Sequence, residues 1–261
     1  IKSIFIRSLV WLKINKKKKL KYTSWLTSIN KELPNKYKSI GPKEVNTGAT
    51  YRGHCDKIQI WREEEIKKVL VHEMGHGMEI EFSPPFYNKN YDSQYDALIK
   101  HLIHIFNIPL DTEIRIYEAY NEVWALIVNC IFSSIEFQKK NLHIDISEIF
   151  NYFMKMEINF SLFQCAKILH FFDFKDFNDF FSLKGFGKNK RIKSKFKQTS
   201  SILSYYIIKS AFLFNINGFF DYCKNHNKDE FHIKFNPYYL KEFQSFIDIC
   251  LSDTFFINIV N

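Results

Sequence analysis

Glycine and proline are scarce in this chain, and their scarcity constrains its fold more than any other feature. The 261 residues include only 8 Gly and 6 Pro, whereas 46% of the residues are hydrophobic and 18% are aromatic. Turns depend on glycine and proline, and long stretches with a helical apolar period lie between them. The sequence therefore predicts a mainly helical protein with a substantial core, and it excludes an intrinsically disordered chain.

Two short segments have the character of strands. Residues 57–61 alternate polar and apolar side chains, as a half-buried strand does. Residues 34–48 contain two Pro and two Gly, which predicts a loop that leads into a short strand near 44–51. Gly53 lies in the expected turn between the strands. We further expect a helix or strand at 3–14 and helices at 20–33, 62–82, 92–106, 111–139, 145–156, 159–173, 175–183, 198–214, 217–225 and 237–250.

The chain is basic, with a formal net charge of +9 that suits an acidic substrate, a nucleic acid or an anionic surface. Basic residues cluster in two runs, at 16–19 and 184–197. Neither an aromatic platform motif nor a zinc-finger spacing accompanies these runs. We therefore interpret them as solvated surface and do not expect a nucleic acid as the partner.

The cysteines indicate a reducing, intracellular compartment. All five are scattered, and none forms a Cys-x-x-Cys pair, which favours free thiols over a disulfide framework. No apolar run is long enough to cross a membrane. The lysines at 16–19 follow an apolar stretch, which is the reverse of the order in a secretory signal. We expect 1–40 to be an N-terminal helical segment, and because the chain begins with Ile rather than Met, a truncation of this segment stays open.

A His-Glu-x-x-His motif carries the chemistry that the sequence predicts. His72 and His76 stand four residues apart in a predicted helix, so their imidazoles share one face. Two imidazoles at this spacing can hold one tetrahedral zinc ion. Glu73 can take a proton from a metal-activated water without being a ligand itself. We therefore expect a zinc-dependent hydrolase with one zinc ion and Glu73 as the general base.

A catalytic zinc ion needs a third protein ligand. Glu118 and Glu122 stand four residues apart on an otherwise apolar predicted helix, where a buried carboxylate requires a partner. We assign Glu118 as the ligand and Glu122 as the acceptor that orients a ligating histidine, and the opposite assignment stays open. His101 and His104 are alternative third ligands, although packing within a helix is the commoner role of such histidines.

The two segments together resemble the gluzincin metallopeptidases. HEMGH, followed by EAYNEVWAL from Glu118 to Leu126, resembles most the angiotensin-converting-enzyme group, which has HEMGH and a later EAxxDVxAL. Glu122 stands where that group has Asp, and the two segments are further apart here. A broader resemblance, over residues 40–225, is to uncharacterised metallopeptidases of giant DNA viruses. It rests on VNTGATY, IWREEEIKKVLVHEMGH, YEAYNEVWALIVNC and TSSILSYYIIKS.

The resemblance implies an α+β, mainly helical fold with a zincin-like catalytic domain at 41–261 and a small sheet beside the active-site helix. In such a domain an edge strand aligns an extended peptide, and 44–51 or 57–61 would be that strand. The resemblance also implies a side chain that stabilises the oxyanion. Tyr205 and Tyr206 are the candidates, with core packing as the alternative role. A peptide or protein is the expected partner, in the host cytoplasm or the virion for a viral chain.

Three functions are compatible with these features. Hydrolysis of a peptide or similar amide bond ranks first. A zincin-fold binding protein with weak or no activity ranks second, and a basic binder of nucleic acid or membrane surface ranks third. An enzyme requires a third ligand beside His72 and His76, whereas an accidental motif would leave both imidazoles facing solvent.

Overall fold

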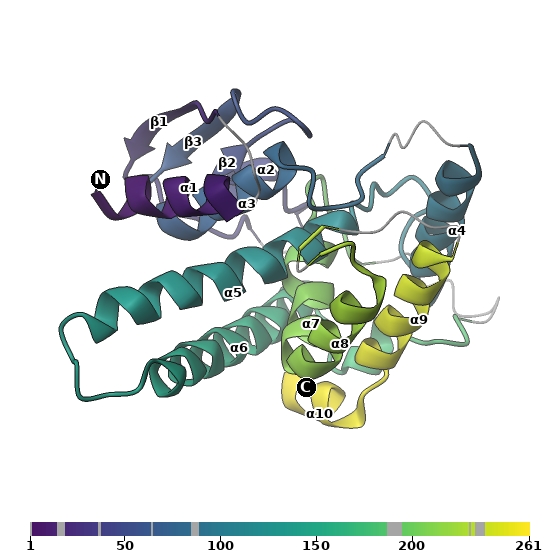
Figure 1. Ribbon diagram of the computed structural model, residues 1–261. Helices are drawn as coiled ribbons and strands as arrows, with labels where there is room; N and C mark the ends of the chain where they lie inside the picture. Colours follow the sequence, from purple (N-terminus) through teal and green to yellow (C-terminus); the bar gives the residue numbers. More distant parts are fainter. Residues whose placement is uncertain are drawn as a thin grey trace. The chain divides into compact units, whose positions relative to one another are not determined.

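The computed structural model describes residues 2–14, 19–35, 38–63, 65–84, 89–186, 195–229, 231–232 and 238–261. Within these residues the chain is mainly helical and has one three-stranded sheet (Figure 1). The predicted α+β, mainly helical class is therefore confirmed. Both predicted basic runs lie partly outside the described residues, at 16–18 and at 187–194.

The chain divides into two compact units, and each unit combines segments that are distant in sequence. Unit 1 comprises Ile1–Lys31, Asn46–Glu81 and Tyr120–Ile158, and unit 2 comprises Glu32–Val45, Phe82–Ala119 and Asn159–Asn261. The division of the chain at residue 40 into an N-terminal segment and a catalytic domain stays a prediction.

Unit 1 contains the sheet, whose strand order is β1-β3-β2. The central strand β3 (Ile58–Arg62) pairs in parallel with β1 (Tyr22–Thr27) and antiparallel with β2 (Gly48–Ala49). Burial alternates along the first residues of β3, as the predicted strand at 57–61 requires. The strand expected near 44–51 is confirmed only at β2, because α2 (Pro42–Val45), in unit 2, is helical.

The helix predicted at 20–33 is wrong, because this segment forms strand β1. Trp25, Leu26 and Ile29 are spaced like one face of a helix, yet all three are exposed. Pairing with β3 decides the structure instead, and the Thr, Trp and Tyr residues of the segment suit a strand. The register shifts after Ser24, next to Leu26 with its positive φ of 43°.

Helix α3 (Ile66–Gly77) packs against β2, β3 and α1 (Lys2–Ile14) (Figure 1). The prediction for this helix, 62–82, was too long at both ends. Glu65 and Glu79 both have a φ of 59°, a left-handed conformation that an α-helix cannot continue through. The chain therefore leaves the helix after Gly77 instead of continuing to the prolines that were expected to stop it.

Two long helices, α5 (Tyr117–Gln138) and α6 (Ile146–Phe171), contribute to both units. In unit 1 the rings of Phe137 and Phe153 join them, with centroids 6.0 Å apart. Helix α5 begins later than the predicted residue 111. Helix α6 runs without a break through the two helices predicted at 145–156 and 159–173.

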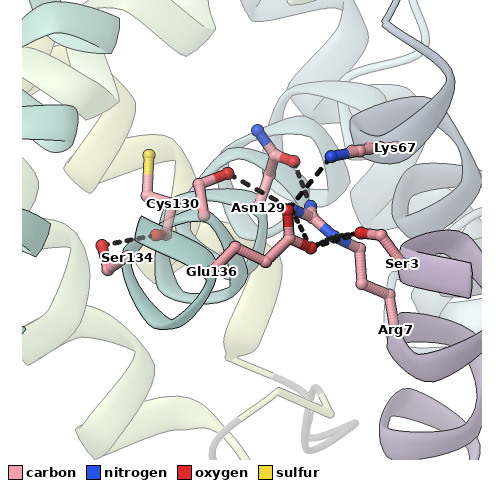
Figure 2. A network of polar contacts seen from close by, with 8 residues as sticks. Ser3, Arg7, Lys67, Asn129, Cys130, Ser134 and Glu136 are labelled. Atoms are coloured by element: carbon pink, nitrogen blue, oxygen red, sulfur yellow. Dashed lines mark hydrogen bonds and ion pairs between the residues drawn. The ribbon is translucent and has the colours of Figure 1, made fainter. Parts of the chain in front are cut away.

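Arg7 of α1 is buried in unit 1 among polar side chains of α5 (Figure 2). Its guanidinium donates to Asn129 Oδ1 at 2.6 Å, to Ser133 Oγ at 3.3 Å and to Glu136 Oε1 at 3.1 Å. Lys67 of α3 donates to the other oxygen of Glu136 at 3.1 Å. The buried cation is therefore compensated, and one polar network joins three helices.

Unit 2 is helical and has an aromatic core. Phe82 packs against Tyr239 and Phe243, with ring centroids 5.7 and 4.9 Å apart, and α9 contacts α4, α7 and α10. Besides α2 and its parts of α5 and α6, the described elements are α4 (Lys89–Ile105), the 3₁₀ turn η1 (Phe177–Asp179), the π-helix η3 (Leu203–Ile208), α7 (Lys209–Phe214), α8 (Ile216–His226), α9 (Tyr239–Leu251) and α10 (Thr254–Val260).

The predicted helices of unit 2 are confirmed for α4, α8 and α9, with small shifts of their ends. The helix expected at 175–183 is wrong, because only the short turn η1 forms there, with its aromatic residue Phe177 packed into the core. The helix expected at 198–214 begins at Leu203, and its first part is a π-helix. Helix α10 was not predicted.

Among the described residues, no single helix is both long and apolar enough to cross a membrane. Helices α9 and α10 meet that criterion only as a pair, and they are bent by 57°. The five cysteines are buried, separate thiols. The intracellular, reducing location stays a prediction.

Candidate metal centre

Helix α3 brings His72 and His76 together. Both side chains are buried, and their Nε2 atoms lie 3.2 Å apart. Two nitrogens that bind one tetrahedral zinc ion at about 2.0–2.1 Å would be separated by about 3.3 Å. The two imidazoles therefore have the spacing that two ligands of one ion require.

Glu118 adds a carboxylate to this group. It is buried in the first turn of α5, and one of its oxygens and one ring nitrogen of each histidine all lie within 4.8 Å of one another. Helix α5 itself sets this position, since Asn121 and Glu122, one turn further on, both contact His72. Two imidazoles and a carboxylate, all buried, fit a metal ion. Among the described residues, His72, His76 and Glu118 thus form a group that can bind one.

Glu122 lies behind His72. Its Oε2 is 2.8 Å from His72 Nδ1, and its Oε1 accepts a hydrogen bond from Lys68 Nζ at 2.5 Å. A carboxylate on the outer nitrogen of a ligating histidine fixes the tautomer and the orientation of the ring. This arrangement is the one expected with Glu118 as the ligand and Glu122 as the orienting acid, and these two roles stay predictions.

Glu81 occupies the equivalent place behind His76, and sequence reasoning missed it. Its Oε1 lies 3.2 Å from His76 Nδ1, and the residue is fully buried. Five residues along a continuous helix, Glu81 would point away from His76. The chain instead turns at Glu79 and brings Glu81 back. The one signal in the sequence was an acid placed between Ile80 and Phe82, where burial of a carboxylate requires a partner.

A glycine permits the close approach of α5 to α3. A Cβ atom on Gly75 would lie 2.0 Å from Asn121 Oδ1, which is closer than any real contact. The same Asn121 donates from Nδ2 to the backbone carbonyl of His72 at 2.8 Å. The second variable position of His-Glu-x-x-His is therefore glycine here because α5 packs against it.

Glu73, the predicted base, is buried on α3 and lies against strand β2. A Cβ atom on Gly48 would come within 2.8 Å of Glu73 Oε1 and 2.9 Å of Glu73 Cγ. The strand order places β2 at an edge of the sheet and β3 in its centre. Of the two segments expected to align a peptide, 57–61 is therefore excluded as an edge strand, and 44–51 contributes β2.

The two candidate tyrosines have different surroundings within unit 2. Tyr205 donates from its hydroxyl to Glu118 Oε2 at 3.1 Å. Tyr206 has its ring beneath Lys209 Nζ, which lies 5.8 Å from the ring centroid. The structure thus brings Tyr205 to a carboxylate of the metal-binding group and makes it the stronger candidate for a role in the site.

The alternative third ligands have other contacts. His101 Nε2 lies 2.8 Å from Asp248 Oδ1 of α9. The ring of His104 lies beside Gly185, where a Cβ atom would come within 2.2 Å of it. Neither histidine belongs to the metal-binding group found among the described residues.

A series of charges leads from Glu122 to the surface of unit 1. Lys68 lies 3.7 Å from Glu65, which also accepts a hydrogen bond from Lys31 at 2.6 Å. Lys68, and then Lys31, lower the pKa of Glu65 to about 2 against the opposing effect of burial. Glu65 is therefore ionised at neutral pH and helps to hold Lys68 beside Glu122.

Comparison with known proteins finds similarity to a viral protein. The chain is 25% identical over 206 residues to an uncharacterised protein of Acanthamoeba polyphaga mimivirus. The match covers 78% of this chain and 46% of that protein, so the chain spans about half the length of its relative. No protein-family model and no solved structure matches the chain. The resemblance to proteins of giant DNA viruses is confirmed to this extent.

Proposed function

We propose that the chain is a zinc-dependent hydrolase that cleaves peptide or similar amide bonds, in a domain of the zincin type. The observation that carries the proposal is the buried group of His72, His76 and Glu118. The two Nε2 atoms lie at ligand spacing, and a carboxylate stands behind each ring. Glu73 directly follows His72 on α3, as the resemblance to gluzincins requires.

His72, His76 and Glu118 would hold the zinc ion, which would act as a Lewis acid and activate water near neutral pH. Glu73 accepts the proton of the attacking water and then donates it to the leaving amine. Glu122 and Glu81 hold the imidazoles in the tautomer that presents Nε2. The hydroxyl of Tyr205, which is hydrogen-bonded to Glu118, is our candidate donor to the oxyanion.

Strand β2 supports a peptide as the substrate. An extended peptide can add to an edge strand through backbone hydrogen bonds. Gly48 of β2 lies directly against Glu73, so a peptide paired with this strand would run past the proposed base. The absence of a side chain at Gly48 keeps the carboxylate close to the strand.

The test combines metal content with turnover for the full chain. We expect one zinc ion per chain by elemental mass spectrometry and cleavage of a peptide library by the wild type. Glu73→Gln should keep its zinc and lose turnover by about 10²- to 10⁴-fold. Glu79→Gln, at an exposed acid just beyond α3, is the matched control. Turnover retained by Glu73→Gln would remove Glu73 from the role of base. Zinc binding without any turnover by the wild type would favour the zincin-fold binding protein.

The same assay separates the two acids of α5. Glu118→Ala should lose most of its zinc, because a ligand is removed. Glu122→Ala should retain more zinc, because only the support of His72 is lost. The opposite order would exchange the two roles.

A further inference from the structure

Helix α1 buries two polar residues beside Trp11 and leaves most of its apolar residues exposed. Arg7 and Ser8 are buried, with exposed fractions of 2% and 4%. Phe5 and Leu9 face outwards, with exposed fractions of 59% and 49%. A helix on the surface of a soluble protein normally turns its apolar face to the core. The exposed positions follow the helical repeat and are Lys2, Phe5, Ile6, Leu9, Val10, Lys13 and Ile14.

The polar network of Arg7 holds α1 in this orientation (Figure 2). A rotation that buried Phe5 and Leu9 would withdraw the guanidinium from Asn129 and Glu136. The hydrogen bonds of a buried cation are costly to break, so the apolar face stays outward. We call the exposed side chains of Phe5, Ile6, Leu9, Val10, Lys2 and Lys13 the outward face of α1. The contacts of Arg7 fix this face towards the outside of unit 1.

Charge indicates what kind of partner this face suits. Residues 1–31 contain eight Lys and one Arg and no Asp or Glu, although the whole chain has 28 acidic residues. Within the described part of this segment, Lys2, Lys13, Lys19 and Lys21 are exposed. A partner must therefore be anionic as well as apolar.

We propose that the outward face of α1 docks on an anionic lipid membrane. Helices of this kind lie in the plane of the membrane interface, with apolar side chains at the boundary between headgroups and acyl chains. Phe5 and Leu9 would enter that boundary, and Lys2 and Lys13 would contact anionic headgroups. This inference does not depend on the metal centre.

Two other partners fit the face less well. A nucleic acid is bound through its phosphates, and four outward apolar side chains add nothing to such contacts. A second copy would bring two acid-free basic segments together, and their like charges would repel each other. A lipid surface satisfies the apolar and the basic side chains at once.

Sedimentation with vesicles tests the proposal. The full chain should bind vesicles of equimolar phosphatidylcholine and phosphatidylserine, and pure phosphatidylcholine vesicles much less. The double variant Phe5→Ser and Leu9→Ser should bind about 30-fold more weakly, because both side chains lose apolar burial. The charge-reversal pair Lys2→Glu and Lys13→Glu should reduce binding by at least about tenfold.

The matched control exchanges two exposed leucines elsewhere in the chain, Leu110→Ser and Leu142→Ser, and should bind like the wild type. Circular dichroism should show that every variant stays folded. The proposal is overturned if the wild type does not sediment with anionic vesicles, or if the control loses as much binding as the variant of α1. It is also overturned if Phe5→Ser and Leu9→Ser instead dissolve a dimer that forms without lipid, or abolish binding to duplex DNA while vesicle binding persists.

Discussion

Glu81 and Glu122 take equivalent places behind the two imidazoles, but their surroundings differ. Glu122 lies between His72 and Lys68, so a cation shares its charge. Glu81 has an exposed fraction of 0% and lies in the short segment after α3, not on a helix. A metal ion on His76 would help to offset the cost of burying this carboxylate.

Glu81→Gln should weaken zinc binding by about 10- to 100-fold, because the amide no longer raises the basicity of His76. Competition with a fluorescent chelator measures the affinity. Glu79→Gln, two residues earlier and exposed, should leave it unchanged. An unchanged zinc affinity in Glu81→Gln would mean that the contact with His76 only holds the segment after α3 in place.

The residues of the site differ in how far the sequence could reveal them. His72, Glu73 and His76 follow from local helix geometry, and Glu118 with Glu122 follows from acids on an apolar helix. Their convergence on one group is a contact between distant segments, which spacing alone does not encode. The role of Glu81 could not be predicted from the sequence, because the position of this residue depends on where α3 ends.

At the level of elements, the contact of α3 with α5 controls the site. Asn121 fills the space above Gly75, and its amide is held there because it donates to the carbonyl of His72. A side chain at residue 75 would therefore push the two helices apart. The candidate ligands on α3 and in the first turn of α5 would separate with them.

Gly75→Ala should destabilise the fold by about 1–3 kcal/mol through overpacking. Asn121→Ala should cost about 1 kcal/mol for the lost hydrogen bond. The double variant should cost less than the sum, because the shorter side chain at position 121 leaves room for the new methyl group. Urea unfolding of the four proteins measures this cycle, and additive effects would show that Gly75 and Asn121 do not compete for space.

Glu136 makes the stability of the polar network between α1, α3 and α5 depend on pH. Burial raises the pKa of Glu136, but hydrogen bonds from Ser3, Arg7 and Lys67 outweigh it and lower the pKa from 4.5 to about 2. A carboxyl with a lowered pKa stabilises the fold fully above its unfolded pKa, and the contribution fades as the pH falls towards the folded pKa. This contribution therefore decreases from pH 4.5 downwards.

Glu136→Gln should lose about 1 kcal/mol at neutral pH, a value reduced for the partial exposure of the side chain. The difference from the wild type should shrink below pH 4.5 and disappear near pH 2. Urea titrations at a series of pH values provide the measurement, with the exposed Glu148→Gln as a control. A difference independent of pH would rule out the ion pair as its source.

The elements themselves were predicted unevenly, for physical reasons. Long helices with a strong apolar period, such as α5 and α6, were found, although their ends moved. Strand β1 was missed because its stability comes from pairing with β3, more than thirty residues away. The π-helical start of the 203–214 segment has no distinct apolar period and could not be recognised.

In the molecule as a whole, the chain divides into two compact units, and no pattern along the sequence indicates this division. Each unit takes three separate segments, and the boundaries at 119/120 and 158/159 fall inside α5 and α6. Composition correctly indicated a large helical core but not how the segments combine. Ligands that come from separate segments of the chain couple metal binding to the stability of the fold.

Removal of the metal should therefore lower the melting temperature. At a free zinc concentration of 100 times Kd, binding contributes about 2.7 kcal/mol. For a chain of this size, that loss corresponds to a shift of about 5–10 °C. Differential scanning calorimetry with and without EDTA measures it, and His72→Ala should not respond to the chelator. An equal shift of the melting temperature in both proteins would show that EDTA does not act through a metal ion bound by His72.

The π-helix that carries Tyr205 restricts the lengths that this chain can have. A π-helix contains one more residue per turn than an α-helix, so residues 203–208 hold a turn that an ordinary helix would make with one residue fewer. Deleting a single residue there would restore regular winding, and the residues that follow, such as Phe212, would keep their faces of the helix. The side chains inside the turn would shift instead, and Tyr205, which donates to Glu118, is one of them. Among related chains that keep this contact, deletions in this turn should therefore be rare.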